Sequence, residues 1–198
     1  MSAGGEGSAA GDASTSAPDE GETEAADAAD DTTDVPDVDC ETTLESDLPG
    51  VTIEIDAACA YSLAEAQAGL DTPYTVAIAE ALAGVDSGDE CQQTPAGSIR
   101  VRWRIEGGNG QRHCQCDIGP CGEYTPMPTD LVVGETMRQF SWAAFDWDGP
   151  SDTGVPYGPA FAPGEYTIVV EATGTWIDPE GATVAFTVRA TRPVLLVQ

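Results

Sequence analysis

The chain has 198 residues and a formal net charge of -28, and all seven of its basic residues are arginines. The absence of lysine excludes Schiff-base chemistry, the lysine of a P-loop and a serine–lysine hydrolase. So negative a chain would be repelled by nucleic acid and by anionic lipid, and we expect neither as a partner. No run of about 18 apolar residues is present, so we also expect no transmembrane segment.

Residues 1–48 are predicted to be a disordered acidic linker that precedes a folded domain over residues 49–198. The linker carries 15 of the 35 acidic residues, no basic residue and almost no large apolar side chain. It therefore cannot bury enough surface to offset its ordering entropy. Its composition resembles the spacer that follows the lipid-modified cysteine of bacterial lipoproteins. Because no signal peptide follows Met1, we expect a mature or trimmed form.

The first predicted elements of the domain are a strand, a short helix and a second strand. Residues 51–55 alternate between apolar and polar side chains, which predicts a half-buried strand. The spacing from Ser62 to Glu65 is that of a capping box, and the alanine-rich turn after it stops at Gly69, so we predict one short helix there. Residues 74–85 are also rich in alanine, but their large apolar residues keep an even spacing. We favour a strand, with a helix as the alternative.

The clearest strand covers residues 98–106, where polar and apolar side chains alternate without exception. The glycine-rich residues after it predict a tight turn, and residues 111–117 the returning strand of a hairpin. Further strands are predicted at residues 137–142, 165–173, 182–192 and 194–197. Strands at short intervals, separated by glycine and proline, predict an all-β fold: an immunoglobulin-like β-sandwich with one short helix.

The six cysteines are expected to form disulfides, because their number is even and paired CxxC metal motifs are absent. They are Cys40, Cys59, Cys91, Cys114, Cys116 and Cys121. Cys114 and Cys116 would point to the same face of an extended strand, so we expect each to bond a different partner. Of about 15 connectivities, we favour Cys59–Cys91 and Cys116–Cys121, which leaves Cys40 for Cys114. A metal site that includes His113 is the alternative.

A segment of about 35 residues resembles a known module. It contains Phe140-Ser-Trp142, Trp147-Asp-Gly149, Gly154 and finally Pro163-Gly-Glu-Tyr166-Thr-Ile-Val-Val-Glu-Ala172. This segment, about residues 137–172, resembles the immunoglobulin-like domain of flagellar hook-capping proteins. Its Pro-Gly-x-Tyr motif is also similar to the intracellular proteinase inhibitor family. Physically, Trp-Asp-Gly would turn the chain off one strand, and Pro-Gly-x-Tyr would begin the next with an aromatic side chain in the core.

Three aspartates are a candidate metal site. Asp146, Asp148 and Asp152 lie within seven residues, a carboxylate density that suits a hard cation such as Ca²⁺. An EF-hand begun at Asp146 would need an acidic residue at its twelfth position, which is Tyr157, so that motif is excluded. The favoured alternative is that these aspartates form turns. Apart from Ca²⁺ we expect no cofactor.

Three arginines are a candidate binding site, because they reverse the negative charge locally. Arg100, Arg102 and Arg104 share one face of the predicted strand, and guanidinium groups bind carboxylates in a bidentate manner. This stripe would suit an anion. The favoured alternative is that the arginines pair with acidic residues on neighbouring strands.

Aromatic residues are the last candidates. Trp142, Trp147, Trp176 and Phe145 could form a platform for sugar or peptide, with a place in the core as the favoured alternative. Catalytic motifs are absent from the sequence: there is one histidine, and neither a GxSxG elbow nor an HExxH motif occurs. We therefore do not expect an enzyme.

The expected function is that of a monomeric binding or structural module of the bacterial cell envelope, secreted or surface-anchored, whose partner is a protein or a glycan. Three disulfides imply an oxidising compartment, so we expect the periplasm, the cell surface or the medium. One alternative is a protease-inhibitor-like protein that acts through residues 150–163. Another is a glycan-acting hydrolase with a pair of carboxylates.

Overall fold

The computed structural model describes residues 39–89, 91–116, 122–123, 125–150 and 154–198. The predicted linker over residues 1–38 lies outside the described part. In chain order the elements are β1 Thr43–Ser46, β2 Val51–Ile55, β3 Ala60–Ser62, α1 Leu63–Ala68, β4 Leu70–Ile78, β5 Arg102–Gly107, β6 Arg112–Cys114, β7 Gly134–Trp142, β8 Gly164–Ile177 and β9 Thr183–Val197.

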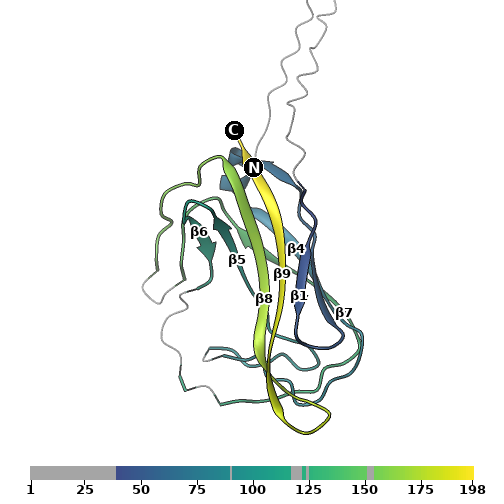
Figure 1. Ribbon diagram of the computed structural model, residues 1–198. Coiled ribbons are helices and arrows are strands. Elements are labelled where there is room, and N and C mark those ends of the chain that lie inside the picture. Colours follow the sequence, from purple (N-terminus) through teal and green to yellow (C-terminus); the bar gives the residue numbers. More distant parts are fainter. Residues whose placement is uncertain (1–38, 90, 117–121, 124, 151–153) are drawn as a thin grey trace, which may run out of the picture. The chain divides into compact units, whose positions relative to one another are not determined.

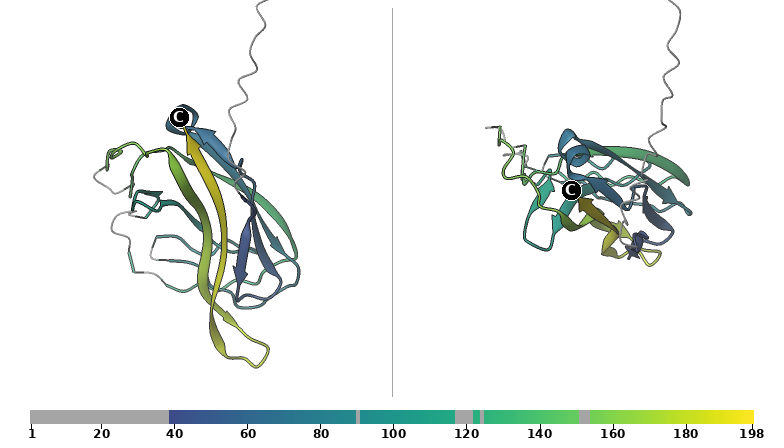
Figure 2. Two further views of the ribbon diagram at one scale, coloured as in Figure 1. Left: turned by 45° about the horizontal axis from the view of Figure 1, so that its top comes forward. Right: turned by 90° about the horizontal axis from the view of Figure 1, so that it is seen from above.

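The strands form two sheets (Figure 1). The larger sheet has the order β1-β9-β8-β5-β6, and β3 also pairs with β9; the smaller sheet has the order β2-β4-β7. All pairs are antiparallel except β3 with β9. The view from above shows the sheets as two layers (Figure 2). The predicted all-β sandwich with one short helix is confirmed, while the immunoglobulin-like assignment rests on the sequence motifs alone.

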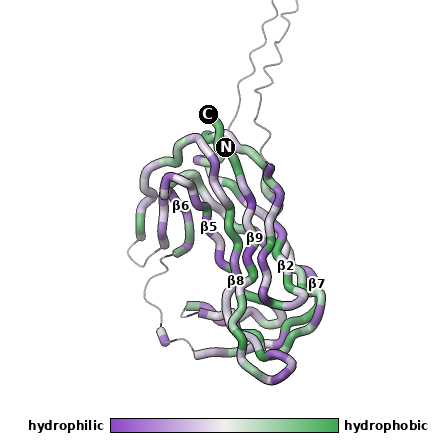
Figure 3. The backbone as a smooth tube through the Cα atoms, viewed as in Figure 1, coloured by the Kyte–Doolittle hydropathy of each residue, from purple (hydrophilic) through white to green (hydrophobic). Residues whose placement is uncertain are grey.

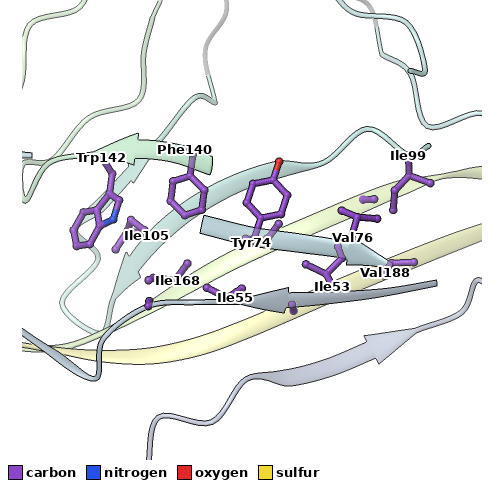
Figure 4. Packing of buried hydrophobic residues seen from close by; sticks show 14 of the residues in the cluster. Ile53, Ile55, Tyr74, Val76, Ile99, Ile105, Phe140, Trp142, Ile168 and Val188 are labelled. Atoms are coloured by element: carbon purple, nitrogen blue, oxygen red, sulfur yellow. The ribbon is translucent and has the colours of Figure 1, made fainter. Parts of the chain in front are cut away.

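The core lies between the two sheets and is filled mainly by alternate residues of the strands, with Leu48, Ile99 and Phe161 among those added by connecting segments. β2 is buried at its first, third and fifth residues and exposed between them, as its period of two predicts. Hydropathy changes repeatedly along β9 in the same way (Figure 3). Each large apolar side chain that is fully buried in this core contributes about 1.5–3 kcal/mol to the stability of the fold. Figure 4 labels core residues from both sheets, together with one that precedes β5: Ile53, Ile55, Tyr74, Val76, Ile99, Ile105, Phe140, Trp142, Ile168 and Val188.

The predicted helix is confirmed as α1. The Ser62 hydroxyl accepts a hydrogen bond from the Glu65 backbone N–H at 3.2 Å, and the Glu65 carboxylate accepts one from the Ser62 N–H at 3.0 Å. These two bonds form the capping box. Gly69, with φ of 107°, ends the helix. No helix in the described part of the chain is long and apolar enough to cross a membrane.

Several strand predictions change at their boundaries. The strand predicted over residues 98–106 is β5, which begins only at Arg102 and ends at Gly107, and the returning strand predicted over residues 111–117 is β6, Arg112–Cys114. The alanine-rich segment after α1 is a strand, as favoured, but β4 ends at Ile78. The last two predicted strands are one strand, β9, that continues through Pro193. This proline falls between the residues that pair with β1, which end at Thr191, and those that pair with β3, which begin at Leu195. The side of Pro193 that lacks an N–H therefore meets no partner strand.

The fold begins before the predicted boundary at residue 48. β1 pairs antiparallel with β9, with Thr43 opposite Thr191, and Leu48 is only 1% exposed. The prediction of disorder is therefore wrong for residues 39–48. All four side chains of β1 are exposed, and the strand forms because the backbone of β9 offers it hydrogen-bond partners.

The disulfides differ from the favoured pairings. Cys40 is bonded to Cys59, and Cys114 is bonded to Cys116. All three favoured pairs are therefore wrong. Cys91 is also disulfide-bonded, and Cys121 lies outside the described residues.

Strand register explains the first disulfide, and a bend explains the second. Thr43 faces Thr191 in an antiparallel pair, and Ala60 faces Leu195 in a parallel pair. Continuing each register outward places both Cys40 and Cys59 beside Val194, with their Cα atoms 5.4 Å apart. The prediction that Cys114 and Cys116 cannot pair assumed an extended chain. β6 instead ends at Cys114 and the chain bends at Gln115, which brings the two Cα atoms within 5.2 Å.

The Pro-Gly-x-Tyr motif begins a strand as predicted. β8 starts at Gly164, and Tyr166 is 4% exposed. The Tyr166 ring stacks on Phe161 with centroids 4.6 Å apart, and its hydroxyl donates a hydrogen bond to the Ala162 carbonyl at 2.9 Å. The expected core aromatic at the start of this strand is confirmed.

Candidate functional site

The candidate site lies beside β6, at one edge of the larger sheet. We call it the aromatic surface and define it as the side chains of Phe145, Trp147 and Tyr157 with the ring of His113 beside them. His113 is the central residue of β6, and the other three follow β7 in the chain. β7 belongs to the smaller sheet and β6 to the larger one, and Phe145 follows the end of β7 by three residues. A short loop from the smaller sheet therefore reaches the edge strand β6 of the larger one.

Backbone hydrogen bonds attach this loop to β6. The Trp147 N–H donates to the Arg112 carbonyl at 2.8 Å, and the Cys114 N–H donates to the Trp147 carbonyl at 2.9 Å. Further out, the Asp146 N–H donates to the Pro159 carbonyl at 2.8 Å. The outer edge of β6 is thus closed by the loop, as buried or functional sheet edges often are.

Aromatic rings form a continuous path from the core to this site. Trp103 stacks on the core ring of Phe140, with centroids 4.5 Å apart, and also on His113 at 6.0 Å. His113 in turn contacts Trp147 at 5.0 Å and Tyr157 at 5.6 Å. Ring pairs at these separations are mutually stabilising. The surface rings are therefore fixed to the core through Trp103.

Tyr157 is the most exposed ring of the site, at 55% of its area. It stacks on Phe145, with centroids 5.5 Å apart and planes at 11°, and meets Trp147 edge-on at 5.6 Å. The Trp147 indole N–H donates to the Val155 carbonyl at 3.0 Å, which orients that ring. The result is a supported but largely uncovered aromatic ring.

His113 supports these rings in its neutral form. It is 1% exposed, and its Nδ1 lies 2.9 Å from the Phe145 carbonyl oxygen. Because a carbonyl can only accept, Nδ1 carries the hydrogen and Nε2 is the unprotonated nitrogen. Burial lowers the pKa of His113 below its ordinary value of 6.5, although the Phe145 hydrogen bond opposes this. The ring is therefore a packing group at neutral pH.

Polar groups border the aromatic surface. The Arg112 guanidinium pairs with the Asp148 carboxylate, and these side chains are 52% and 46% exposed. The hydrogen bond and charge of Asp148 raise the pKa of Arg112 above its ordinary range. The Arg112 backbone N–H donates to Asp146 Oδ1 at 3.0 Å, and Gln111 Nε2 donates to the Ala160 carbonyl at 3.0 Å. Exposed donors and acceptors thus lie next to the rings.

The predicted calcium site is described only in part. Asp146 and Asp148 both bind Arg112, through its backbone N–H and its guanidinium respectively. Asp152 lies outside the described residues. Binding of Ca²⁺ by the three aspartates stays a prediction.

One group of three potential metal ligands is found in the described part of the chain. The ligand atoms of Cys114, Cys116 and Asp148 all lie within 4.8 Å of one another. The two sulfur atoms are bonded to each other. In this disulfide form neither cysteine can supply the thiolate that a metal needs.

The three arginines of the predicted anion-binding stripe are in ion pairs. Arg100 and Arg102 both contact the Asp89 carboxylate, at 3.0 and 2.5 Å. Arg104 contacts acidic residues of β5 and β8. Arg100, Arg102 and Asp89 line a polar hollow of about 150 Å³ on the larger sheet. Their charges are balanced by neighbouring acids, and anion binding here stays a prediction.

The four aromatic residues predicted as a platform separate into two pairs. Trp142 is 2% exposed and donates from Nε1 to the Thr72 hydroxyl at 3.0 Å, and Trp176 is 9% exposed. Both belong to the core. Phe145 and Trp147 belong to the aromatic surface.

The sequence does not single out two members of the aromatic surface as an aromatic site. Tyr157 enters as the residue that excludes an EF-hand and as part of the predicted inhibitory loop, and His113 as a possible metal ligand or catalytic group. The density of aromatic residues between positions 140 and 161 is a signal that could have pointed to the loop. No periodic pattern could have placed that loop beside β6.

Comparisons of the chain with protein-family models, with curated proteins and with solved structures found no match. The resemblance to hook-capping proteins and to proteinase inhibitors therefore stays a prediction. Any functional conclusion must come from the fold and the aromatic surface.

Proposed function

We propose that the chain is a non-enzymatic binding module of the bacterial cell envelope, and that it holds a neutral glycan on its aromatic surface. The observation that carries the proposal is the position of Tyr157. Its ring is 55% exposed although it contacts three other rings. A rigidly supported, uncovered aromatic ring with a polar border is typical of binding surfaces.

The chemistry of the site suits a sugar. One face of a sugar ring presents C–H groups, which pack on a flat aromatic ring, and its edge presents hydroxyls that donate and accept hydrogen bonds. Tyr157 would supply the flat ring. Arg112 and Asp148, exposed at 52% and 46%, would supply a donor and an acceptor.

The charge of the chain selects among glycans. At a net charge of -28 the protein repels anionic sugars such as sulfated or uronic acid polymers. A neutral glycan meets no such barrier. The polar groups at the site are also balanced in sign, because the exposed arginine has an exposed aspartate beside it.

The proposed location follows from the disulfides and the acidic segment. Cys40–Cys59 and Cys114–Cys116 would be reduced in a typical cytosol, so they support an extracytoplasmic compartment. The composition of residues 1–38 suits a self-repelling spacer that would hold the domain away from the point of attachment.

Isothermal titration calorimetry of the full chain tests this function. The probes are hexamers of glucose, of N-acetylglucosamine and of mannose. We expect at least one to bind, and Tyr157→Ala to weaken that binding by about tenfold or more, because it removes the exposed ring. Tyr157→Phe should retain most of the affinity.

Ile177→Ala is the matched control, since Ile177 is 45% exposed but lies at the end of β8. It should leave the affinity unchanged. The proposal is rejected if none of the three hexamers binds, or if Tyr157→Ala binds as well as the wild type.

Protease inhibition through residues 150–163 is a second candidate, favoured by one observation. Residues 154–160 are exposed, yet the loop is fixed by the Trp147 indole bond to the Val155 carbonyl and by a Gly158 N–H bond to the Asp146 carbonyl at 2.7 Å. A loop ordered before binding loses little entropy when a protease captures it. Residues 151–153 lie outside the described residues.

A panel of secreted serine, cysteine and metalloproteases tests this candidate. Inhibition at micromolar concentration with the loop intact would support it. Cleavage within the loop without inhibition would reject it.

A further inference from the structure

β7 is an edge of the smaller sheet, and β2 is the other edge. The outer side of β2 is capped by hydroxyls: Thr42 donates to the Ile55 carbonyl at 3.2 Å, and Ser46 donates to the Val51 carbonyl at 2.9 Å. Among the residues that the structure describes, the outer backbone groups of β7 have no such partner. The outer backbone groups are therefore partly hydrogen-bonded at the β2 edge of the smaller sheet and open at its β7 edge in the described part of the chain.

The pairing of β4 shows which groups of β7 point outward. The Asp56 N–H donates to the Pro73 carbonyl at 3.0 Å, so Pro73 and every second residue of β4 direct their backbone groups toward β2. The residues between them, such as Tyr74, direct theirs toward β7, where Tyr74 faces Arg138. The other set of β7 residues therefore directs its N–H and C=O groups away from the sheet. This set is Glu135, Met137, Gln139 and Ser141.

The same residues expose their side chains. Met137 is 78% exposed, the largest value among the exposed large apolar residues of the described part. Val133, two positions before Glu135, is 59% exposed. A long unpaired edge with exposed apolar side chains is a site at which another strand can add to the sheet.

We propose that two copies of this chain pair through β7, antiparallel and about a two-fold axis at Met137. In this register Met137 faces Met137 of the second copy, and Glu135 faces Gln139 of the second copy. The outward groups of these residues would form about six backbone hydrogen bonds, because such residues exchange two bonds per pair. The two small sheets would become one continuous sheet.

The register is complementary to itself, which favours a second copy as the occupant. No two carboxylates and no two guanidiniums face each other directly, and Glu135 meets an amide that can donate to it. The two exposed methionines cover one another. Both strands are ordered before they meet, so they lose less conformational entropy than a flexible peptide captured at this edge.

The proposed contact does not use the residues of the aromatic surface. It is made by the backbone of residues 135–139, whereas Phe145, Trp147 and Tyr157 follow β7 in the chain. Two such surfaces on one particle would bind a repeating ligand more tightly than one. This pairing replaces the monomer expected from the sequence and does not depend on what the aromatic surface binds.

Sedimentation equilibrium of the full chain tests the proposal. The chain's charge of -28 repels a second copy, and salt screens this repulsion. We expect a dimer whose association constant rises between about 0.05 M and about 0.5 M NaCl. Met137→Pro removes an outward N–H but no bond to β4, and it should weaken association by about tenfold or more.

Substitutions at Gln139 test the register. Gln139→Glu sets two carboxylates opposite each other at both symmetric contacts and should weaken the dimer, whereas Gln139→Arg sets a guanidinium opposite Glu135 and should strengthen it. Each effect should be about threefold to tenfold. Circular dichroism and thermal melting verify that the variants fold.

Met137→Lys and Ile177→Lys form a matched pair, because each replaces an exposed apolar residue with the same charge. The first should weaken the dimer and the second should not. A chain that stays monomeric up to about 1 mM in high salt overturns the proposal. A dimer that tolerates Met137→Pro, or that responds in the same direction to both Gln139 substitutions, also overturns it.

Discussion

The core lies between the two sheets, and the aromatic surface lies beside β6. Both regions contain large aromatic side chains, but the core buries them and the aromatic surface leaves Tyr157 exposed. In the core Phe140 and Trp142 are 5% and 2% exposed, whereas Tyr157 in the aromatic surface is 55% exposed. Most core residues, including Phe140 and Trp142, come from alternate positions on strands, whereas Tyr157 comes from a loop. Burial makes the first group the source of stability. The second group remains available for a ligand.

The comparison teaches that a ring can be held firmly without being buried. Trp103 contacts the core ring of Phe140 and the ring of His113, which contacts Tyr157. Tyr157 is therefore positioned by a chain of neighbours that ends in the core. Changes in the core should alter stability, and changes at Tyr157 should alter binding.

The largest expected effect is in the core. Phe140→Ala should lower the free energy of unfolding by about 3–5 kcal/mol, because it removes a buried ring and leaves a cavity. Urea denaturation followed by circular dichroism measures this change. A loss below about 1 kcal/mol would mean that the core does not dominate stability.

The two described disulfides should differ in how much they stabilise the fold, with the larger contribution from the one that is attached to the strands of the larger sheet. The Cys40–Cys59 bond spans a sequence separation of 19 and joins the chain segments beside β9, whereas Cys114–Cys116 spans 2 and adjoins the aromatic surface. The entropy of loop closure predicts losses of about 3 kcal/mol and about 1 kcal/mol when each pair is replaced by alanine. Guanidinium denaturation under non-reducing conditions compares them, and the reverse order would contradict the prediction.

His113, which links the core to the aromatic surface through Trp103 and Trp147, should make the stability of the fold depend on pH. Burial lowers its pKa in the folded chain below 6.5, so the unfolded chain takes up the proton first as the pH falls. The contribution of neutral His113 is complete above about pH 6.5 and is lost progressively below it.

His113→Phe removes this titration and keeps a ring. The difference in unfolding free energy between wild type and variant should shrink from about pH 7.5 to about pH 5. Urea denaturation across this range gives the difference at each pH. A constant difference would show that the histidine charges as readily in the fold as in the unfolded chain.

The smallest expected change in stability is at Tyr157. Tyr157→Ala should alter the free energy of unfolding by only about 0.5 kcal/mol, as is usual for a side chain more than half exposed. Thermal and urea denaturation measure this change beside the calorimetric loss of binding. A loss of several kcal/mol would place Tyr157 with the core.

The predictable parts of the fold are those in which burial alternates along a strand. β2 matches its predicted bounds, and the capping box of α1 could be read from Ser62 and Glu65, because these signals lie within a few residues. β1 could not be predicted, because its side chains are all exposed. The register of β1 and β3 on β9 determines the Cys40–Cys59 pair, so this disulfide could not be predicted for the same reason.

The aromatic surface was only partly predictable, because backbone contacts assemble it. The bond from the Trp147 N–H to the Arg112 carbonyl brings the loop to β6. Any residue type except proline can donate such a backbone bond, so the sequence contains no signal for it. Phe145 and Trp147 could be named as candidates from their ring chemistry. Their meeting with His113 and Tyr157 depends on the tertiary fold.

The Cys40–Cys59 disulfide also decides how the domain would carry mechanical tension from its amino-terminal side. A pull on the chain before Cys40 would otherwise peel β1 from β9 one bond at a time. Because Cys40 precedes β1, the covalent bond passes the load to Cys59, whose carbonyl accepts the Leu195 N–H at 2.8 Å. β1 and β2 lie between the two cysteines in the chain, so the applied force would bypass them. The longer strands would carry that force instead.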